Sequence, residues 1–506
     1  MAETFLHGVE VVEIDAGSRP ISTVSSSIIG LIGTAPNSQV EVKAALATGV
    51  IASNSAQTWT SKLTGVNGNN ISLKVVKPAT NSAALAVSVV GTAITVSLAT
   101  NSSGIATTTA TQLASAIAAN AAANALVGVA NTGASTGAGV VPVLATAYLS
   151  GGIDEAFPLN KPTLIAGSRL EAAKLGTGGT LADAVDSIFD QTGAVIVVIR
   201  IEEGEDDAGT LANVLGGVNS VTGDYEGVHA FLGAESALGF APRILIAPGF
   251  THQRDTTANA VVAELIGIAE RMRAMIIADG PNTTDAAAIT YSGDFGSSRV
   301  YLVDPWVLKV DADTGETVQA PASPCAAGLI AKSDNERGFW WSPSNQTING
   351  IVGTVRAVDF KQGDASSRAN LLNEQGVATI IRLNGYRLWG NRSLSDDPKW
   401  AFLCVRRTAD IINDSILRAH LWAVDRGITK TYIEDVTEGV KAYLRTLITL
   451  GAIIDGTCWA DAELNTPENI AQGKVYFDFD FGPTYPAEHI TFRSMLNNGY
   501  LTEVFA

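Results

Sequence analysis

Apolar and polar residues alternate strictly from Val475 to Phe481, near the C-terminal end of the chain. A period of two predicts a strand with Val475, Phe477, Phe479 and Phe481 on one face and Asp478 and Asp480 on the other. After the breakers Gly482-Pro483 and Pro486, Ile490 and Phe492 alternate with Thr491 and Arg493. The pattern therefore predicts a terminal β-hairpin in which Arg493 lies beside the two aspartates.

Both ends of the chain carry further extended patterns. The N-terminal strand is predicted over Val9, Glu10, Val11, Val12, Glu13 and Ile14, and Ala16-Gly17-Ser18-Arg19-Pro20 predicts a non-helical linker after it. At the other end, Asn498-Gly499 predicts a turn before the segment Leu501, Thr502, Glu503, Val504 and Phe505. Strands without a nearby partner leave open edges. These edges are either covered by the protein's own sheet or paired with another molecule.

The middle of the chain alternates short apolar runs with helical patterns. The predicted buried strands are 194–201, 243–247, 274–278 and 300–303, with a helix over 258–273 and an exposed hairpin over 306–317. Continuous apolar strands separated by helices are typical of a mainly parallel sheet that is covered on both faces. We therefore expect an open α/β domain here.

The last third begins with a short helix and a strand over 378–383. Ile412, Ile416 and Ala419 form one helical stripe, and a second helix follows with its N-terminus at Thr431, spaced from Glu434 as in a capping box. This helix is expected to end at Gly451. Together with the terminal hairpin, these elements predict a C-terminal α+β domain.

One stretch differs in composition, because no charged residue occurs between Pro78 and Gly152. Two alternating segments flank Gly91-Thr92 as a tight hairpin, and an alanine-rich segment over 114–125 predicts a helix. This regularity favours a small α+β module over 38–152 rather than a disordered linker.

The overall charge limits the function classes. The net charge is −17 and its acidic excess lies in the middle, where residues 153–365 sum to −14, so binding to nucleic acid through a broad basic surface is not expected. No apolar run approaches the ~20 residues of a membrane span, and no signal peptide is predicted. The three cysteines have no metal-ligand spacing, which favours synthesis in a reducing cytosol.

No catalytic motif completes a site. Asp279 and Asp304 follow predicted strands, where ligands bind in open α/β sheets, and His252 follows another strand end. The phosphate-binding loop, the nucleophile elbow and the His-Glu-x-x-His zinc motif are missing from the sequence. We therefore expect no enzyme, no metal and no cofactor.

A basic cluster follows in the last third, comprising Arg382, Arg387, Arg392, Lys399, Arg406 and Arg407. One interpretation is a solvated face or internal salt bridges to acidic helices. The other is a charged interface that faces an acidic partner surface.

Several segments resemble one known family in their order along the chain. They are Ile21–Ser25, Ile28–Ala35, Phe157–Pro162, Asp396–Trp400, Asn465–Ile470 and the predicted hairpin from Val475 to Arg493. The resemblance is to the contractile tail sheath proteins of bacteriophages and of related R-type bacteriocin particles. Residues 38–152 match none of these segments, and by this resemblance they are an insertion.

The resemblance implies a structural subunit that polymerises in rings around an inner tail tube and contracts to drive the tube through a host envelope. Its partners would be neighbouring copies, the inner tube, the baseplate and the tail terminator, without nucleic acid or membrane insertion. Terminal strands would pair between subunits, with hinges at Ala16, Gly17, Asn498 and Gly499. The subunit would be assembled in the host cytoplasm and reside in the virion tail.

The implied division of the chain runs as follows: 1–20, N-terminal strand-exchange arm and linker; 21–37, start of the core domain; 38–152, inserted module on the outer face; 153–365, α/β core domain; 366–499, C-terminal α+β domain; 500–506, C-terminal strand-exchange arm. A static tail component that shares the exchanged strands without contracting is the alternative. An α/β enzyme with an unrecognised site is a third interpretation.

Overall fold

The computed structural model describes residues 20–254, 256–311 and 314–505. It divides into two compact units. The smaller unit comprises Asn37–Pro158 with Ala173–Thr177, and the larger unit comprises the remaining segments.

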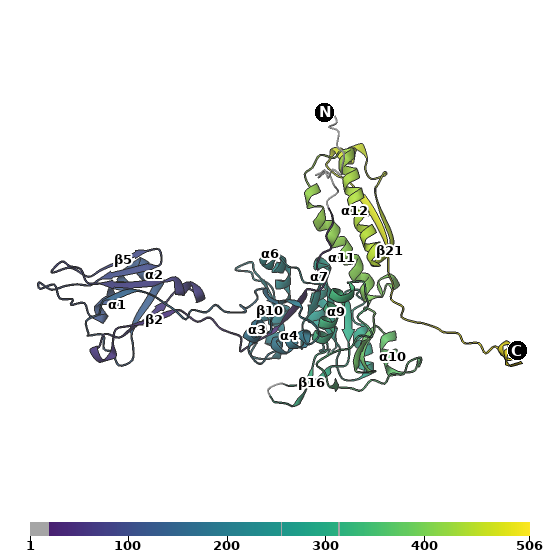
Figure 1. The fold of residues 1–506 in the computed structure, drawn as a ribbon, viewed down its shortest axis with the longest axis horizontal. Coiled ribbons are helices and arrows are strands. Elements are labelled where there is room, and N and C mark those ends of the chain that lie inside the picture. Colours follow the sequence, from purple (N-terminus) through teal and green to yellow (C-terminus); the bar gives the residue numbers. More distant parts are fainter. Residues whose placement is uncertain (1–19, 255, 312–313, 506) are drawn as a thin grey trace. The chain divides into compact units, whose positions relative to one another are not determined.

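The larger unit is built on an eight-stranded sheet. Its strands, in order across the sheet, are β20 (Tyr386–Trp389), β19 (Val377–Arg382), β15 (Val300–Val303), β14 (Met275–Asp279), β13 (Ile244–Ile246), β1 (Ile29–Thr34), β10 (Val195–Ile201) and β9 (Thr163–Ala166). Figure 1 labels one of these strands, β10, and several of the helices of this unit. The six central strands are parallel, and the edge strands β9 and β20 are antiparallel to their neighbours. The predicted open, mainly parallel sheet is confirmed.

Three strands of this sheet, β1, β19 and β20, come from outside residues 153–365. β1 lies at the centre, between β13 and β10, and β19 continues the sheet beyond β15. The prediction that the strand over 378–383 belongs to the C-terminal domain is wrong, because this strand pairs with β15. Parallel neighbours can be far apart in sequence, so a local pattern identifies such a strand without identifying its sheet.

Helices cover both faces of the central sheet. They are α3 (Arg169–Ala172), α4 (Leu181–Phe189), α5 (Asp207–Leu215), α6 (Ala234–Leu238), α7 (Ala260–Met272), α8 (Asp285–Ser292), α9 (Ser323–Arg337) and α10 (Arg368–Glu374). Ile32, Leu245 and Ile276 point to the core cluster that contains α7. The alternate strand residues are also fully buried and face the side of α4 and α9, since successive strand side chains point to opposite faces.

Smaller strand pairs complete this part of the unit. β11 (Gly217–Val218) pairs with β12 (Tyr225–Glu226), and β16 (Val307–Val310) pairs with both β17 (Thr317–Ala320) and β18 (Gly353–Thr354). The antiparallel pair β16–β17 is the hairpin that the sequence predicted over 306–317.

A helical pair and a two-stranded sheet form the C-terminal part of the larger unit. The helices α11 (Leu403–Ala419) and α12 (Lys430–Leu450) share a core with β21 (Ile453–Ala460) and β22 (Phe477–Pro483), and α13 (Pro467–Ala471) lies between the two strands in sequence. The side chain of Thr429 accepts a hydrogen bond from the backbone N–H of Tyr432, so the N-cap of α12 lies two residues before the predicted cap at Thr431. The helix ends as predicted at Gly451, whose φ of 79° suits glycine.

The predicted strand pairing of the terminal hairpin is wrong. β22 is the expected alternating strand, but its antiparallel partner is β21, with Ala460 opposite Phe477 and Ile453 opposite Pro483. Ile490, Phe492 and Arg493 lie in no strand and are exposed. Leu501, Thr502, Glu503, Val504 and Phe505 lie in a 3-10 helix, Asn498–Phe505, and not in an extended strand in this single chain.

The smaller unit has a hydrophobic core of its own. One sheet has the order β2 (Ala45–Thr48), β3 (Gln57–Ser61), β7 (Val127–Asn131), and the other has the order β5 (Ala86–Val90), β6 (Ala93–Ser97), β4 (Ser72–Val76), β8 (Leu144–Tyr148). The helices α1 (Ala110–Ala119) and α2 (Ala121–Leu126) pack with Trp59, Leu73 and Ile94 in that core. The charge-free stretch is therefore an ordered α+β module, with the predicted hairpin at Gly91-Thr92.

None of the helices in the described part of the chain is both long and apolar enough to cross a bilayer.

Candidate assembly interface

The sheet β21–β22 has one face that packs into the body of the subunit. The rings of Phe479 and Phe481 lie 6.3 Å apart and pack against the core that contains Val440 and Leu444 of α12. Phe477 lies 6.3 Å from the ring of Tyr432. The aromatic residues of this alternation thus share one face, as the sequence predicted, and that face packs against the subunit's own core.

The other face of this sheet is acidic. Asp480 accepts a hydrogen bond of 3.0 Å from the backbone N–H of Thr457. Desolvation and the neighbouring carboxyl of Asp461 raise the pKa of Asp478. The predicted cross-strand partner of these aspartates, Arg493, lies outside the sheet.

Within the described residues, β21 and β22 pair only with each other. Each strand therefore keeps one backbone edge that can accept another strand. A two-stranded sheet is marginal by itself, and packing against α12 stabilises this one. Edges of this kind are the sites at which a strand of another molecule adds.

The segment after β22 exposes apolar side chains that have no core to join. Ile490 is 65% exposed, Phe492 93%, Met495 90% and Leu496 89%. Tyr500, Leu501 and Val504 are also exposed, and the predicted hinge residues Asn498 and Gly499 begin the 3-10 helix. A run of exposed large apolar residues marks a contact surface.

The predicted N-terminal strand Val9, Glu10, Val11, Val12, Glu13 and Ile14, and the hinge residues Ala16 and Gly17, lie outside the described residues. The chain that follows them is well anchored. Ile21 and Val24 pack against the core of α11 and α12, the Thr23 hydroxyl lies 3.2 Å from that of Tyr443, and the N–H of Val24 donates to Ser415.

The basic cluster is not one surface. The side chain of Arg407 is only 4% exposed and pairs with Asp334 of α9, so its assignment to a charged interface is wrong. Arg406 binds Asp410 at 2.7 Å and stacks over Trp400. Arg387 donates to the carbonyl oxygens of Leu383 and Asn345. Arg392 binds Glu488, whereas Arg382 and Lys399 are exposed and lie over the rings of Tyr386 and Trp400, respectively.

A row of buried charges on α11 was not found from the sequence. Arg407, Asp410 and Asp414 follow one another at spacings of three and four and lie on one side of the helix. Asp410 binds Arg299, next to β15, and Asp414 binds Arg243, next to β13; all four side chains are nearly buried. Charges within an otherwise apolar helical face are the signal that could have identified them, because buried charges require partners.

Polar side chains at the carboxyl ends of the central strands form contacts within the fold. Burial raises the pKa of Asp279 to about 6, while hydrogen bonds from Ser323 and Thr251 oppose that shift. Burial also raises the pKa of Asp304, which accepts from the N–H of Asn282 and binds Arg356. Burial lowers the pKa of His252, whose ring lies 4.8 Å from that of Trp306.

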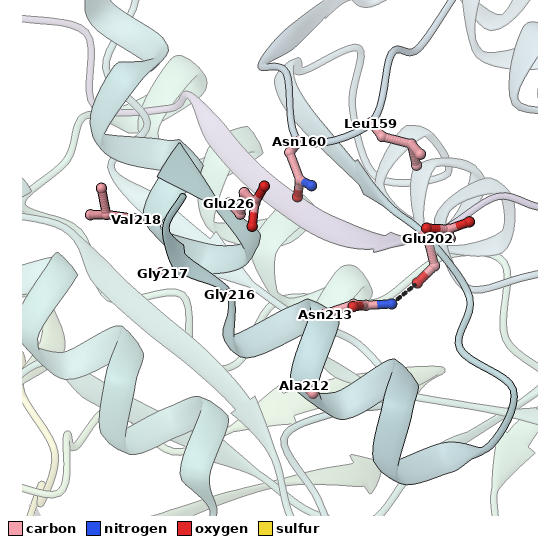
Figure 2. A pocket seen from close by; sticks show the side chains of 9 residues that line it. All are labelled: Leu159, Asn160, Glu202, Ala212, Asn213, Gly216, Gly217, Val218 and Glu226. Carbon is pink, nitrogen blue, oxygen red and sulfur yellow. Dashed lines mark hydrogen bonds between the residues drawn. The ribbon is translucent and has the colours of Figure 1, made fainter. Parts of the chain in front are cut away.

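A polar hollow of about 360 Å³ lies beside β11 and β12 (Figure 2). Figure 2 shows the amide of Asn213 donating to the backbone oxygen of Glu202, at 3.0 Å. Asn160 has a φ of 56° and accepts a hydrogen bond of 2.9 Å from the N–H of Gly227, so it holds the turn after β12. These contacts make Asn160 a structural residue. Within the described residues, no group of three or more acidic, histidine or cysteine side chains could hold a metal ion.

Comparisons with known proteins identify two matching family models. The phage tail sheath protein central domain matches residues 223–394, and the phage tail sheath C-terminal domain matches residues 395–497. A putative prophage major tail sheath protein of Pseudomonas aeruginosa (strain UCBPP-PA14) is 47% identical over 68% of this chain and 88% of its own length. The tail sheath protein of Escherichia phage P2 is 39% identical over 69% and 88%, and that of Burkholderia phage BcepMu is 31% identical over 99% and 98%.

Solved structures of similar fold come from contractile injection systems. The sheath complex of the extracellular contractile injection system PVC, in its contracted state, superposes with a TM-score of 0.52 at 18% identity, over 68% of this chain and 88% of that chain. The helical sheath of the anti-feeding prophage, also contracted, gives 0.52 at 22% identity, over 67% and 89%.

Proposed function

The chain belongs to the phage tail sheath family, and from this membership we propose that it is the structural subunit of a contractile tail sheath. Many copies polymerise around an inner tube, and the assembly contracts to drive that tube through the host cell envelope. The single observation that carries the proposal is identity of up to 47% to tail sheath proteins. The β21–β22 sheet agrees with it, because each of its two strands has an edge with which no other described strand pairs.

Polymerisation would occur by strand exchange. Two segments would add as strands to the open edges of a neighbour's sheet. They are Leu501–Phe505 of one subunit and Val9–Ile14 of another. The exposure of Ile490, Phe492, Met495 and Leu496 supports this role, since these side chains would be covered only after assembly. The 3-10 helix Asn498–Phe505 is weakly stabilised, because 3-10 hydrogen bonds have poor geometry and runs of this length are uncommon, so its conversion to a strand would cost little.

The proposed partners are neighbouring copies of the chain, the inner tail tube, the baseplate and the tail terminator. The proposed location is the tail of the virion, after assembly in the cytoplasm of the bacterial host. The subunit would perform no catalysis. An α/β enzyme would bind its ligand at the strand ends near Asp279, Asp304 and His252. These three side chains instead make buried contacts within the fold.

We also propose that the module over 38–152 is an insertion on the outer face of the sheath. Two relatives are covered over 88% of their length by only 68% and 69% of this chain, which leaves about a third of it without a counterpart in those two proteins. The separate hydrophobic core of the module supports its independence.

Electron microscopy of the purified protein tests the proposed function. Long hollow cylinders that shorten and widen after a contraction trigger, such as mild denaturant, are the expected result. Cylinders that never shorten would favour a static tail component, and discrete monomers or dimers at high concentration would contradict a sheath.

A further inference from the structure

The C-terminal segment stays on the body of its own subunit for only five residues after β22. The hydroxyl of Thr484 donates to the backbone oxygen of Gly451 at 2.8 Å. The ring of Tyr485 meets the ring of Phe402 edge-on, with centroids 6.1 Å apart. Glu488 then accepts two hydrogen bonds from Arg392, at 2.8 and 2.6 Å.

Beyond Glu488, the side chains described between His489 and Val504 are all exposed. The contact at Glu488 is thus the point at which the chain leaves the body, well before the predicted hinge at Asn498-Gly499. We call residues 489–505 the C-terminal arm.

The receiving surface is built by the loop between β20 and α11. Arg392 and Phe402 face each other in an isolated antiparallel bridge, and the N–H of Ser393 donates to the oxygen of Ala401. The guanidinium of Arg392 also lies over the ring of Phe402, 5.4 Å from its centroid. These contacts therefore form one continuous stack, in which the charged pair Glu488–Arg392 is followed by the two rings of Phe402 and Tyr485, and none of the four residues is buried.

The strength of this stack is intermediate. The side chains of Arg392 and Glu488 are 41% and 36% exposed, so salt screens their attraction. The two-point geometry nevertheless fixes a direction, because both nitrogens of the guanidinium fork are engaged. The N-terminal segment differs, since it is held through the nearly buried Arg407, which donates to the backbone oxygen of Ser26 at 3.0 Å.

We propose that Arg392, Phe402, Tyr485 and Glu488 form a releasable clamp that sets the direction in which the C-terminal arm leaves the subunit and presents the arm to a second copy of this chain. This inference rests on the proposed function only for the identity of the partner. The closed clamp pre-orders the arm, so that less conformational freedom is lost when a neighbour binds it. Release of residues 485–488 would add four residues to the arm, roughly 13 Å of extended reach.

The clamp is tested first in the purified subunit with a glutamyl endopeptidase. Cleavage after Glu488 should be at least fivefold faster in Arg392→Glu than in the wild type, because the scissile segment is freed. Cleavage after Glu503, which is exposed and distant from the clamp, serves as an internal reference and should not change. The matched control is Arg382→Glu, since Arg382 is also exposed and also lies over an aromatic ring, that of Tyr386.

Presentation of the arm is tested by the rate of polymerisation. Arg392→Glu should polymerise several-fold more slowly than the wild type and Arg382→Glu, and should end in the same cylinders. The exchanged pair Arg392→Glu with Glu488→Arg should recover part of the rate. Raising the salt concentration should slow the wild type more than Arg392→Gln.

The outcomes separate the clamp from the sheath assignment. Equal cleavage after Glu488 in all variants, or faster cleavage without any change in polymerisation rate, would overturn the clamp. A wild type that never forms cylinders would contradict the proposed function instead, and the protease experiment would still decide whether the clamp exists. Circular dichroism confirms that each variant is folded before either comparison is made.

Discussion

Three buried ion pairs connect α11 to the body of the larger unit. Arg407 binds Asp334, Asp410 binds Arg299, and Asp414 binds Arg243. A buried pair adds little net stability relative to apolar residues, but the loss of one partner leaves a buried charge uncompensated. The pairs therefore fix how the helix sits on the strands more than they strengthen the fold.

The substitution Asp414→Asn tests this interpretation. Burial already lowers the pKa of Arg243, and a neutral amide in place of the carboxylate could not balance its charge, so the free energy of unfolding should fall by about 3 to 5 kcal/mol. The control is Glu438→Gln, which removes an exposed pair with Lys441 and should cost less than about 1 kcal/mol. Urea denaturation followed by circular dichroism measures both. Equal losses in the two variants would contradict the proposed role of Asp414.

Asp279 gives the fold a defined response to pH. Because burial raises its pKa from 3.8 to about 6, the native state binds the proton more tightly than the unfolded chain does. The stability from this group is complete below about pH 3.8 and is lost as the pH rises to about 6, a change of roughly 3 kcal/mol.

Asp279→Asn cannot ionise, so the stability advantage of the wild type over this variant should shrink by roughly 2 to 3 kcal/mol between pH 4 and pH 7. Urea denaturation across that range measures the difference. An advantage that stays constant with pH would mean that Asp279 does not titrate in this range.

At the scale of the elements, the sequence predicted strands and helices better than it predicted their partners. The alternation from Val475 to Phe481 identified β22 and the shared face of its aromatic residues, and the apolar runs identified β10, β13, β14 and β15. Pairing failed where the partner is distant. β22 joins β21 across α13, and β1 joins β10 across the whole module, so loop length carries no signal about these neighbours.

The candidate interface was also predictable only in part from the sequence. The C-terminal arm contains more apolar residues than a hairpin can bury, so the sequence alone indicates that some of them are exposed. Charge counting could not separate Arg407, which is buried, from Arg382, which is exposed, because both are arginines in a mixed local pattern. The acid partner that decides the role of Arg407, Asp334, lies 73 positions away.

Removal of Tyr500–Ala506 tests the arm as an element. The described side chains of this segment are exposed and join no core, so the truncated protein should keep its circular dichroism spectrum and its denaturation midpoint. It should sediment as a monomer, because the strand that a neighbour would accept is gone. Cylinders that still form would contradict the strand-exchange role. Global unfolding would show instead that the segment belongs to its own subunit's core.

At the scale of the whole molecule, the module should be separable from the sheath machinery. Its two chain ends lie together, since the N–H of Ala156 donates to the oxygen of Gln39 at 3.2 Å and Val42 pairs with Ile153. A variant without Ser38–Gly152, closed by a short linker, should therefore fold and polymerise. Electron microscopy should show cylinders of smaller outer diameter. Loss of assembly, or density for the wild-type module against the tube, would contradict an external insertion.

Insertions in the linker Ala16-Gly17-Ser18-Arg19-Pro20 should affect contraction without affecting assembly. The chain is fixed from Ile21 onward by packing against α11 and α12 and by the hydrogen bond from Val24 to Ser415, so added length before Ile21 remains slack. Each inserted residue adds up to ~3.3 Å of reach. Two or three insertions should leave the predicted strand Val9–Ile14 unchanged in sequence, and cylinders should still assemble.

Contraction should then stall, because a slack tether lets one subunit rotate without pulling its neighbour into the second packing. Particle length before and after the contraction trigger, measured by electron microscopy for the wild type and the insertion variant, checks this expectation. A matched control inserts the same residues between Gly91 and Thr92, at the tip of an exposed hairpin in the module, where neither assembly nor contraction should change. Normal contraction of the lengthened linker variant would exclude coupling through the N-terminal tether, while leaving the family assignment intact.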